Sequence, residues 1–310
     1  MRLDILAALS GIFVAVQSRA NGELAFRLQN SLEAACISFG SGLVVLMVFT
    51  YFHDGIKNGL RNIFRASSSG AIPRWRLFGG SLGGVVIAIQ THIVPLIGVA
   101  IYSVSVISGQ TAISLLVDRL GLTGGGKRHI SVRRVTAAAL TVVAVVISVW
   151  DRLDAPMSSA AVVLGIISGG IIGLQRALNG QVNEHSGQSF ATTLLNFITG
   201  TALLLLLFTI GLITHYSHLS PVKLTPWWMY LGGVTGVIYI AFASTVVQHL
   251  GVLTFTLFSV GGQLFGSLLF DIFLPSQGVH VGAYLVTGIF MTYIGVLANS
   301  ERLGSGRRSG

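Results

Sequence analysis

The sequence predicts an all-α polytopic membrane protein, with ten transmembrane helices arranged as two inverted five-helix repeats. Three observations support this prediction: the composition, the length of the apolar segments and an internal duplication. Hydrophobic residues make up 52% and charged residues 9% of the 310 positions, and the mean hydropathy is +0.79. Soluble domains carry about 25% charged residues, so this composition indicates a protein that lies mostly in lipid.

Apolar stretches recur along the whole chain and have the length of membrane-spanning helices. A helix needs about 20 apolar residues to cross a hydrocarbon core about 30 Å thick. The first stretch could also be a cleaved signal peptide, but an internal counterpart, described next, leads us to expect that it stays in the protein. We place the ten segments near residues 3–22, 32–52, 77–95, 97–118, 134–150, 159–178, 190–212, 228–247, 250–271 and 281–298.

The chain contains an internal duplication. Residues 10–46 align without a gap with residues 168–204, at an offset of 158, and residues 75–118 align with residues 228–271, at an offset of 153. Identical residues occupy 22 of these 81 aligned positions, whereas apolar sequences would match at roughly one position in ten by chance. Each repeat therefore holds five of the predicted segments.

An odd number of crossings in each repeat places the second copy upside down relative to the first. Basic residues test this orientation, because cytoplasmic loops are enriched in Lys and Arg. With the N-terminus in the cytoplasm, 15 basic residues, Arg176 among them, fall on the inner side and four on the outer side. The loops after the second and fourth segments carry five basic residues each. In the second repeat, the loop that matches the first of these carries one basic residue, Lys223, and the loop that matches the other carries no basic residue.

The expected organisation has three parts, with both termini in the cytoplasm. Residues 1–150 form the first repeat, with its N-terminus inside, residues 151–300 form the inverted second repeat, and residues 301–310 form a flexible basic cytoplasmic tail. This topology and contact with anionic lipid explain the formal net charge of +9. Nucleic acid is therefore not an expected partner.

Two polar motifs lie in otherwise apolar segments and occur once in each repeat. One is Gln-x-x-x-Asn-Gly, at residues 17–22 and 175–180, and the other is Gln-x-x-x-Ser-x-x-x-Asp, at residues 110–118 and 263–271. Steps of four residues keep side chains on one face of a helix, and polar groups in hydrocarbon need a partner or a function. We expect these faces to line two half-pathways for a solute. The candidate pathway residues are Gln17, Asn21, Gln110, Ser114, Asp118, Gln175, Asn179, Gln263, Ser267, Asp271 and, in the seventh segment, Asn196.

A structural role is the alternative for each of these residues. Buried amides form hydrogen bonds between membrane helices, and Asp118 and Asp271 lie near segment ends, where water can solvate a carboxylate. Gly11 and Gly169, near the middle of their segments, either allow close packing of two backbones or leave room for a solute.

The sequence carries no signature of an enzyme, a metal site or a cofactor site. The stretch Gly121-x-x-x-x-Gly126-Lys127 resembles a phosphate-binding loop, but Arg128 stands where Mg²⁺ needs Ser or Thr, and a membrane segment precedes it where a strand is needed. Cys36 is the single cysteine, which excludes an intrachain disulfide and a Cys-x-x-Cys site. We therefore expect no catalytic residue, no metal and no cofactor.

The Gln17-x-x-x-Asn21-Gly22 motif, followed by LLVDRLGLTGGGKRHISVRR at residues 115–134, resembles the YdcZ-like family of the drug/metabolite transporter superfamily. Members of that family occur as single five-helix units or as fused ten-helix pairs. The resemblance extends from about residue 5 to residue 298, although IFLPSQGVH follows Asp271 where a basic cluster is expected. It implies a ten-helix transporter or exporter in the bacterial inner membrane.

Inverted repeats are typical of secondary transporters, in which a site near the midplane opens to each side in turn. We expect an alternating-access transporter or exporter of a small polar metabolite, embedded as a multi-pass protein in the bilayer. No acidic residue lies at mid-depth in the first or sixth segment, so a neutral, zwitterionic or modestly polar solute fits better than a drug-like cation. An uncoupled channel-like facilitator and a non-transporting structural or assembly protein are the alternatives. The coupling ion and a homodimer stay open.

Overall fold

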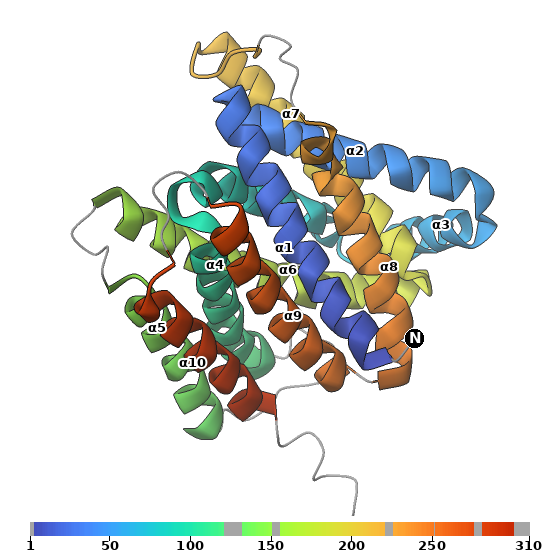
Figure 1. Cartoon of the computed structure of the whole chain (residues 1–310). Coiled ribbons are helices and arrows are strands. Elements are labelled where there is room, and N and C mark those ends of the chain that lie inside the picture. The colour runs from blue at the N-terminus through green and yellow to red at the C-terminus, as the bar shows by residue number, and fades with distance from the viewer. Residues whose placement is uncertain are drawn as a thin grey trace, which may run out of the picture.

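The computed structural model describes residues 3–120, 132–150, 156–220, 226–250, 252–275 and 281–300. These residues form helices and no strand, so the predicted all-α class is confirmed (Figure 1). The elements are α1 (Leu3–Leu28), α2 (Ser31–Phe52), α3 (Asp54–Ser68), the 3₁₀ helix η1 (Arg74–Phe78), α4 (Gly79–Leu120), α5 (Val132–Ser148), α6 (Pro156–Ser186), α7 (Ser189–Ile213), the 3₁₀ helix η3 (Trp227–Leu231), α8 (Gly232–Leu250), α9 (Val252–Phe273) and α10 (Ala283–Ser300).

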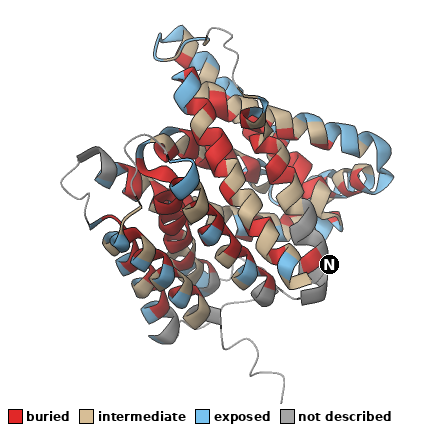
Figure 2. Cartoon of the chain, in the orientation of Figure 1, coloured by how far each residue is buried: buried red, intermediate tan, exposed pale blue. Residues whose placement is uncertain are grey.

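Large apolar side chains cover the outside of the bundle. On α7, Leu205, Leu206 and Ile210 are exposed, and Val44 and Val48 are exposed on α2, while the buried residues gather along the inner helix faces (Figure 2). Such a surface requires an apolar solvent. Six candidate membrane spans lie at Leu3–Leu28, Ser31–Phe52, Arg74–Val117, Ser159–Ser186, Ser189–Ile213 and Phe255–Phe273. The protein is therefore a multi-pass membrane protein.

The expected boundary between segments 77–95 and 97–118 falls at a break inside α4. Gly98 has φ 82° and ψ 170°, a conformation that is strained for any residue with a Cβ. Pro95, three residues earlier, removes a backbone donor. Helix α8 ends at Leu250 and α9 begins at Val252. Position 251, which lies between them, is equivalent to Gly98 at the offset of 153.

A side chain from the other half of the chain caps the part of α4 that follows the break at Gly98. The first N–H groups of a helix have no partner within the helix, and those of Val99 and Ala100 donate to the two carboxylate oxygens of Asp271, at 3.0 and 2.8 Å. Asp271 is 2% exposed. Its carboxylate thus acts as an N-cap and lies at the positive end of the helix dipole.

Helix α3 is an element that the hydropathy pattern did not predict, because it is too polar to cross a membrane. Ile56 and Ile63 are buried on one face, whereas Arg61 and Arg65 are exposed on the other. Gly59 lets this face approach α7, since a Cβ built at Gly59 would lie 2.7 Å from the Ala191 Cβ. An amphipathic basic helix of this kind lies along the membrane surface.

Glycines at equivalent positions make equivalent backbone contacts between the halves. A Cβ at Gly11 would overlap the carbonyl oxygen of Ser259, and a Cβ at Gly169 would overlap that of Val106. Ser259 and Val106 are themselves equivalent at the offset of 153. Gly11 and Gly169 therefore serve close packing of α1 on α9 and of α6 on α4, which settles the alternative left open above.

Where equivalent helices touch each other, they run antiparallel. Phe39 on α2 and its equivalent Phe197 on α7 pack in a tilted pair with ring centroids 5.0 Å apart. Gly42 faces Phe197, and Gly200 faces Phe39, so the residue numbers rise on one helix as they fall on the other. Helices α5 and α10 also lie side by side (Figure 1). Such reciprocal contacts are those of a two-fold axis.

The cap on α4 predicts a stability effect. Asp271→Asn replaces one charged acceptor oxygen with a donor, so we expect a loss of about 0.5–2 kcal/mol and a lower Tm in detergent, measured by scanning fluorimetry. Asp54→Asn is the control, because Asp54 is exposed and pairs with Lys57 at the start of α3. That Lys57 contact holds the pKa of the Asp54 carboxyl below its usual value. Equal Tm values for the two variants would contradict the capping role of Asp271.

Candidate functional site

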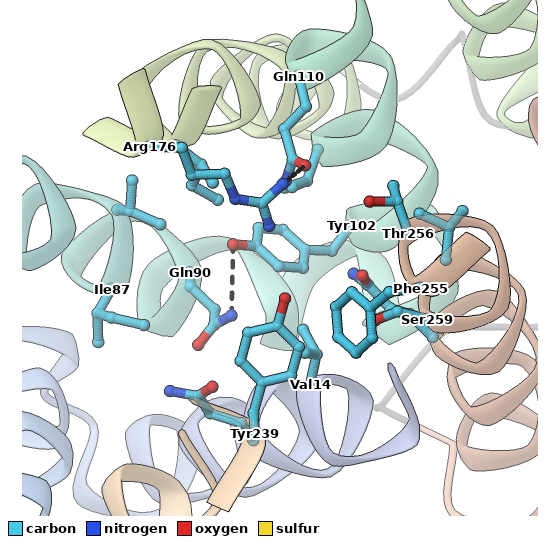
Figure 3. Close-up of a pocket in the computed structure, with 16 residues that line it drawn as sticks. Val14, Ile87, Gln90, Tyr102, Gln110, Arg176, Tyr239, Phe255, Thr256 and Ser259 are labelled. Carbon is cyan, nitrogen blue, oxygen red and sulfur yellow. Dashed lines mark hydrogen bonds between the residues drawn. The ribbon is translucent and has the colours of Figure 1, made fainter. Parts of the chain in front are cut away.

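A cavity of about 160 Å³ lies at the centre of the bundle, between α1, α4, α6, α8 and α9 (Figure 3). Liquid water occupies about 30 Å³ per molecule, so the cavity has room for about five waters. Pockets for drug-sized ligands hold about 300–1,000 Å³. The space therefore fits a small metabolite. Two other hollows lie at helix ends, beside Asn30 and beside Glu23.

The cavity lies where the two aligned parts of the chain meet. Many lining residues occur as equivalent pairs, one from each half, in the alignment at offsets of 158 and 153. A site on the axis between two similar halves has this property. The pairs are Val14 with Ile172, Val86 with Tyr239, Tyr102 with Phe255, Val106 with Ser259, and Gln110 with Gln263.

Three of the predicted pathway residues line this cavity: Gln17, Gln110 and Gln263. Gln110 accepts a hydrogen bond from Arg176 Nη1 at 2.9 Å. Gln263 is 9% exposed and lies 3.4 Å from the Ser103 hydroxyl, to which its Nε2 donates. These amides place polar groups from α1, α4 and α9 around one apolar space.

The remaining amides of the first motif pack against glycines outside the cavity lining. A Cβ at Gly83 would lie 2.8 Å from Gln175 Nε2, and one at Gly79 would lie 2.9 Å from Asn179 Oδ1. Asn196 faces the same glycine, with its Oδ1 3.8 Å from that Cβ position. In this structure Gln175, Asn179 and Asn196 lie where α6 and α7 meet the start of α4.

Asn21 belongs to a buried network centred on Gln90. Asn21 Nδ2 donates to Gln90 Oε1 at 2.8 Å. Gln90 Nε2 donates to the Ser18 hydroxyl at 3.0 Å and to the Tyr102 hydroxyl at 3.3 Å. Gln90 and Tyr102 also line the cavity, so this network forms one wall and holds its polar groups in place.

The second motif differs between its two copies. On α9, Ser267 is fully buried and its hydroxyl lies 2.7 Å from that of Ser103, while Asp271 caps α4. On α4, Ser114 is half-buried and donates to the Thr111 carbonyl at 2.7 Å. The side chain of Asp118 lies outside the described residues. The α9 copy is therefore sealed by contacts with α4, whereas Gln110 and Ser114 are partly accessible.

Arg176 is a cavity residue that is absent from the predicted pathway residues. It lies inside α6, which continues to Ser186, and its guanidinium points into the cavity beside Tyr102 (Figure 3). The duplication gave no signal for Arg176 or Gln90, since the equivalent positions hold Ser18 and Ala243. A charge inside the apolar run of α6 was the signal that could have identified Arg176.

Side chains that bind metals do not cluster in the described parts of the chain. No group of three or more His, Cys, Asp or Glu residues lies close enough there to hold an ion. Cys36, on α2, is half-buried and unbridged. The chemistry available around the cavity is thus hydrogen bonding from amides and hydroxyls, apolar and aromatic contact, and one guanidinium.

Comparison with known proteins agrees with this picture of a membrane bundle around a small cavity. No curated protein matches the chain. A family model described as "Putative inner membrane exporter, YdcZ" matches residues 3–147 and 160–298, which is nearly the whole chain. One matched range falls within residues 1–150 and the other within residues 151–300. The chain therefore belongs to the YdcZ family of membrane proteins, whose description is that of inner membrane exporters.

Proposed function

We propose that this protein is a secondary transporter, or exporter, that moves a small polar metabolite across the bacterial inner membrane by alternating access. One observation carries this proposal: equivalent residues from both halves line a single central cavity, but the two copies of the Gln-x-x-x-Ser-x-x-x-Asp motif are exposed to different extents. A cavity that is accessible along one half and sealed along the other is expected of one state of an alternating-access cycle.

The proposed architecture is ten membrane segments in two inverted repeats. Six candidate spans are described, one of which breaks at Gly98, and three shorter apolar helices lie at Val135–Ser148, Trp227–Ile240 and Ala283–Ala298. Together they make up ten apolar segments among the described residues. The antiparallel contacts of α2 with α7 and of α5 with α10 support inversion, because equivalent helices that meet across an axis in the membrane plane run in opposite directions.

Exchange of the two halves supplies the proposed transport step. Ser103 and Ser267 hold α4 against α9, and Asp271 holds the start of the second half of α4. In the alternate state we expect this closure to open, and the equivalent closure to form along Gln110 and Ser114. The two states need similar free energies for the exchange to be reversible, and two similar halves meet that requirement.

The orientation proposed above keeps both termini in the cytoplasm. Without Arg176, which lines the cavity, 14 basic residues remain inside and four outside, which is still a strong bias. Arg61 and Arg65 of α3 then face the cytoplasmic lipid surface. The accessible motif on α4 runs toward the cytoplasm, so the state described here is the inward-open one.

The orientation can be tested with two exposed loop positions, Ser69 and Thr214. Ser69 follows α3, between α2 and the next span, and Thr214 directly follows α7; α2 and α7 are equivalent helices. In a Cys36→Ala background, a membrane-impermeant maleimide added to intact cells should label Thr214→Cys and leave Ser69→Cys unlabelled until the cells are permeabilised. Labelling of both variants in intact cells would contradict the inverted arrangement.

The proposed role of the cavity can be tested with the double variant Gln110→Ala, Gln263→Ala. It removes one amide from each half, so we expect loss of flux in proteoliposomes with normal membrane insertion, for a solute identified by thermal-shift screening of small metabolites. Gln181→Ala is the matched control, because Gln181 is a helical glutamine, on α6, that does not line the cavity. Full flux in the double variant would remove the cavity from the pathway.

The same flux assay separates the alternative functions. A transporter that alternates shows counterflow, in which unlabelled solute on one side accelerates entry of labelled solute. Flux without counterflow would select the channel-like facilitator, and no flux of any solute that the protein binds would select the structural or assembly role.

Motion between α4 and α9 can be tested by a reversible cross-link. The hydroxyls of Ser103 and Ser267 are 2.7 Å apart, so the pair Ser103→Cys, Ser267→Cys in the Cys36→Ala background should form a disulfide. We expect oxidation to abolish flux and reduction to restore it, whereas the two single-cysteine variants should not respond. Undiminished flux in the oxidised double variant would show that these helices do not separate during transport.

A further inference from the structure

One charged side chain lines the central cavity. Arg176 reaches in from α6, and its Nη1 donates to Gln110 Oε1 on α4 at 2.9 Å (Figure 3). The other described lining residues are neutral. The close-up also shows the Tyr239 hydroxyl pointing into the space beside Tyr102, opposite the arginine.

No described carboxylate neutralises the charge of Arg176. The ion pairs among the described residues join Arg19 and Arg27 to Glu23, and Lys57 to Asp54. A charge inside a membrane bundle is costly unless it is paired or serves a ligand. Arg176 is exposed and its guanidinium lies at the cavity, so it is accessible to a solute.

The geometry of this site favours a carboxylate. A guanidinium presents five N–H donors in a planar fork, and the Gln110 contact uses one of them and orients the rest. A carboxylate accepts two parallel bonds from such a fork. Beyond the charged end, Val14, Phe255 and the ring of Tyr102 offer apolar contact, which suits a short carbon chain.

The count of charges limits the solute further. One cation neutralises one negative charge, and a second negative charge would be left unpaired in a medium of low dielectric constant, at a high cost. An amino acid would bring an ammonium group, for which the described lining offers no carboxylate. The volume of about 160 Å³ suits a small anion.

We infer that this cavity binds a small organic monoanion and that Arg176, oriented by Gln110, holds its carboxylate. The inference deepens the proposed transport function and rests on it. The position equivalent to Arg176 in the first repeat holds Ser18. Ser18 is uncharged, and its hydroxyl accepts a hydrogen bond from Gln90 Nε2. The site is therefore asymmetric, with one cation and room for one anion in each cycle.

Binding of small probes to the purified full-length protein tests this inference. The probes are propionate, lactate and pyruvate, with propionamide and lactamide as neutral matches, propylamine as the cation and malonate as the dianion. We expect the three monocarboxylates to bind by isothermal titration calorimetry and to raise the Tm at neutral pH, and the other four compounds to do neither.

Variants at Arg176 assign the binding to this side chain. Arg176→Gln should weaken propionate binding roughly ten- to hundredfold, as expected for loss of hydrogen bonds to a charged group, and Arg176→Lys should keep part of the affinity, because it keeps the charge without the fork. Arg61→Gln, on the exposed face of α3, is the matched control and should bind as the wild type does. Unchanged Tm values without ligand show that the variants are folded.

Three results would overturn the inference: equal binding of propionate and propionamide, unchanged propionate affinity in folded Arg176→Gln, or no binding of any monocarboxylate by the wild type. Flux of neutral solutes with counterflow, independent of Arg176, would reject the anion site and leave the transporter proposal standing. Absence of binding and flux for every class of solute would reject both.

Discussion

The structure depends on one constraint: a polar group inside a bilayer must find its partner within the protein. Asp271 satisfies two backbone N–H groups that the break at Gly98 leaves open, and Asn21 satisfies Gln90. These side chains are committed to helix ends and helix contacts. The polar groups that remain around the central cavity, chiefly Arg176 and Gln110, bond to each other and still have donors to offer. The constraint thus separates polar residues that hold the bundle from those that a solute can use.

Packing between the halves follows from the absence of a hydrophobic driving force in lipid. Helices associate there through close van der Waals contact, which small residues allow. Gly11 allows α1 to pack closely on α9, and Gly169 allows α6 to pack closely on α4. Each of these two helix pairs therefore contains one helix from each half of the chain. Neither half encloses the cavity alone. Relative movement of these pairs changes the cavity walls without exposing new backbone to lipid.

Composition and periodicity predicted the helical class, the apolar segments and the boundary at Gly98, because the length of a membrane span is a direct physical requirement. Duplication identified Gln17, Gln110 and Gln263 as cavity residues, since each has a counterpart. It could not identify Arg176 or Gln90, which occur in one half only. Helix α3 escaped detection for a different reason: its buried face is narrow, and packing on α6 and α7 stabilises it.

Helix α3 also bears on how the protein is made. It spans 15 residues directly after α2, so it leaves the ribosome long before α6 and α7, its packing partners. In the orientation proposed above, its basic residues keep this loop in the cytoplasm during translation. The second half, poor in basic residues of its own, then enters a membrane in which the first half is already oriented. The order of synthesis therefore contributes to the final topology of the chain.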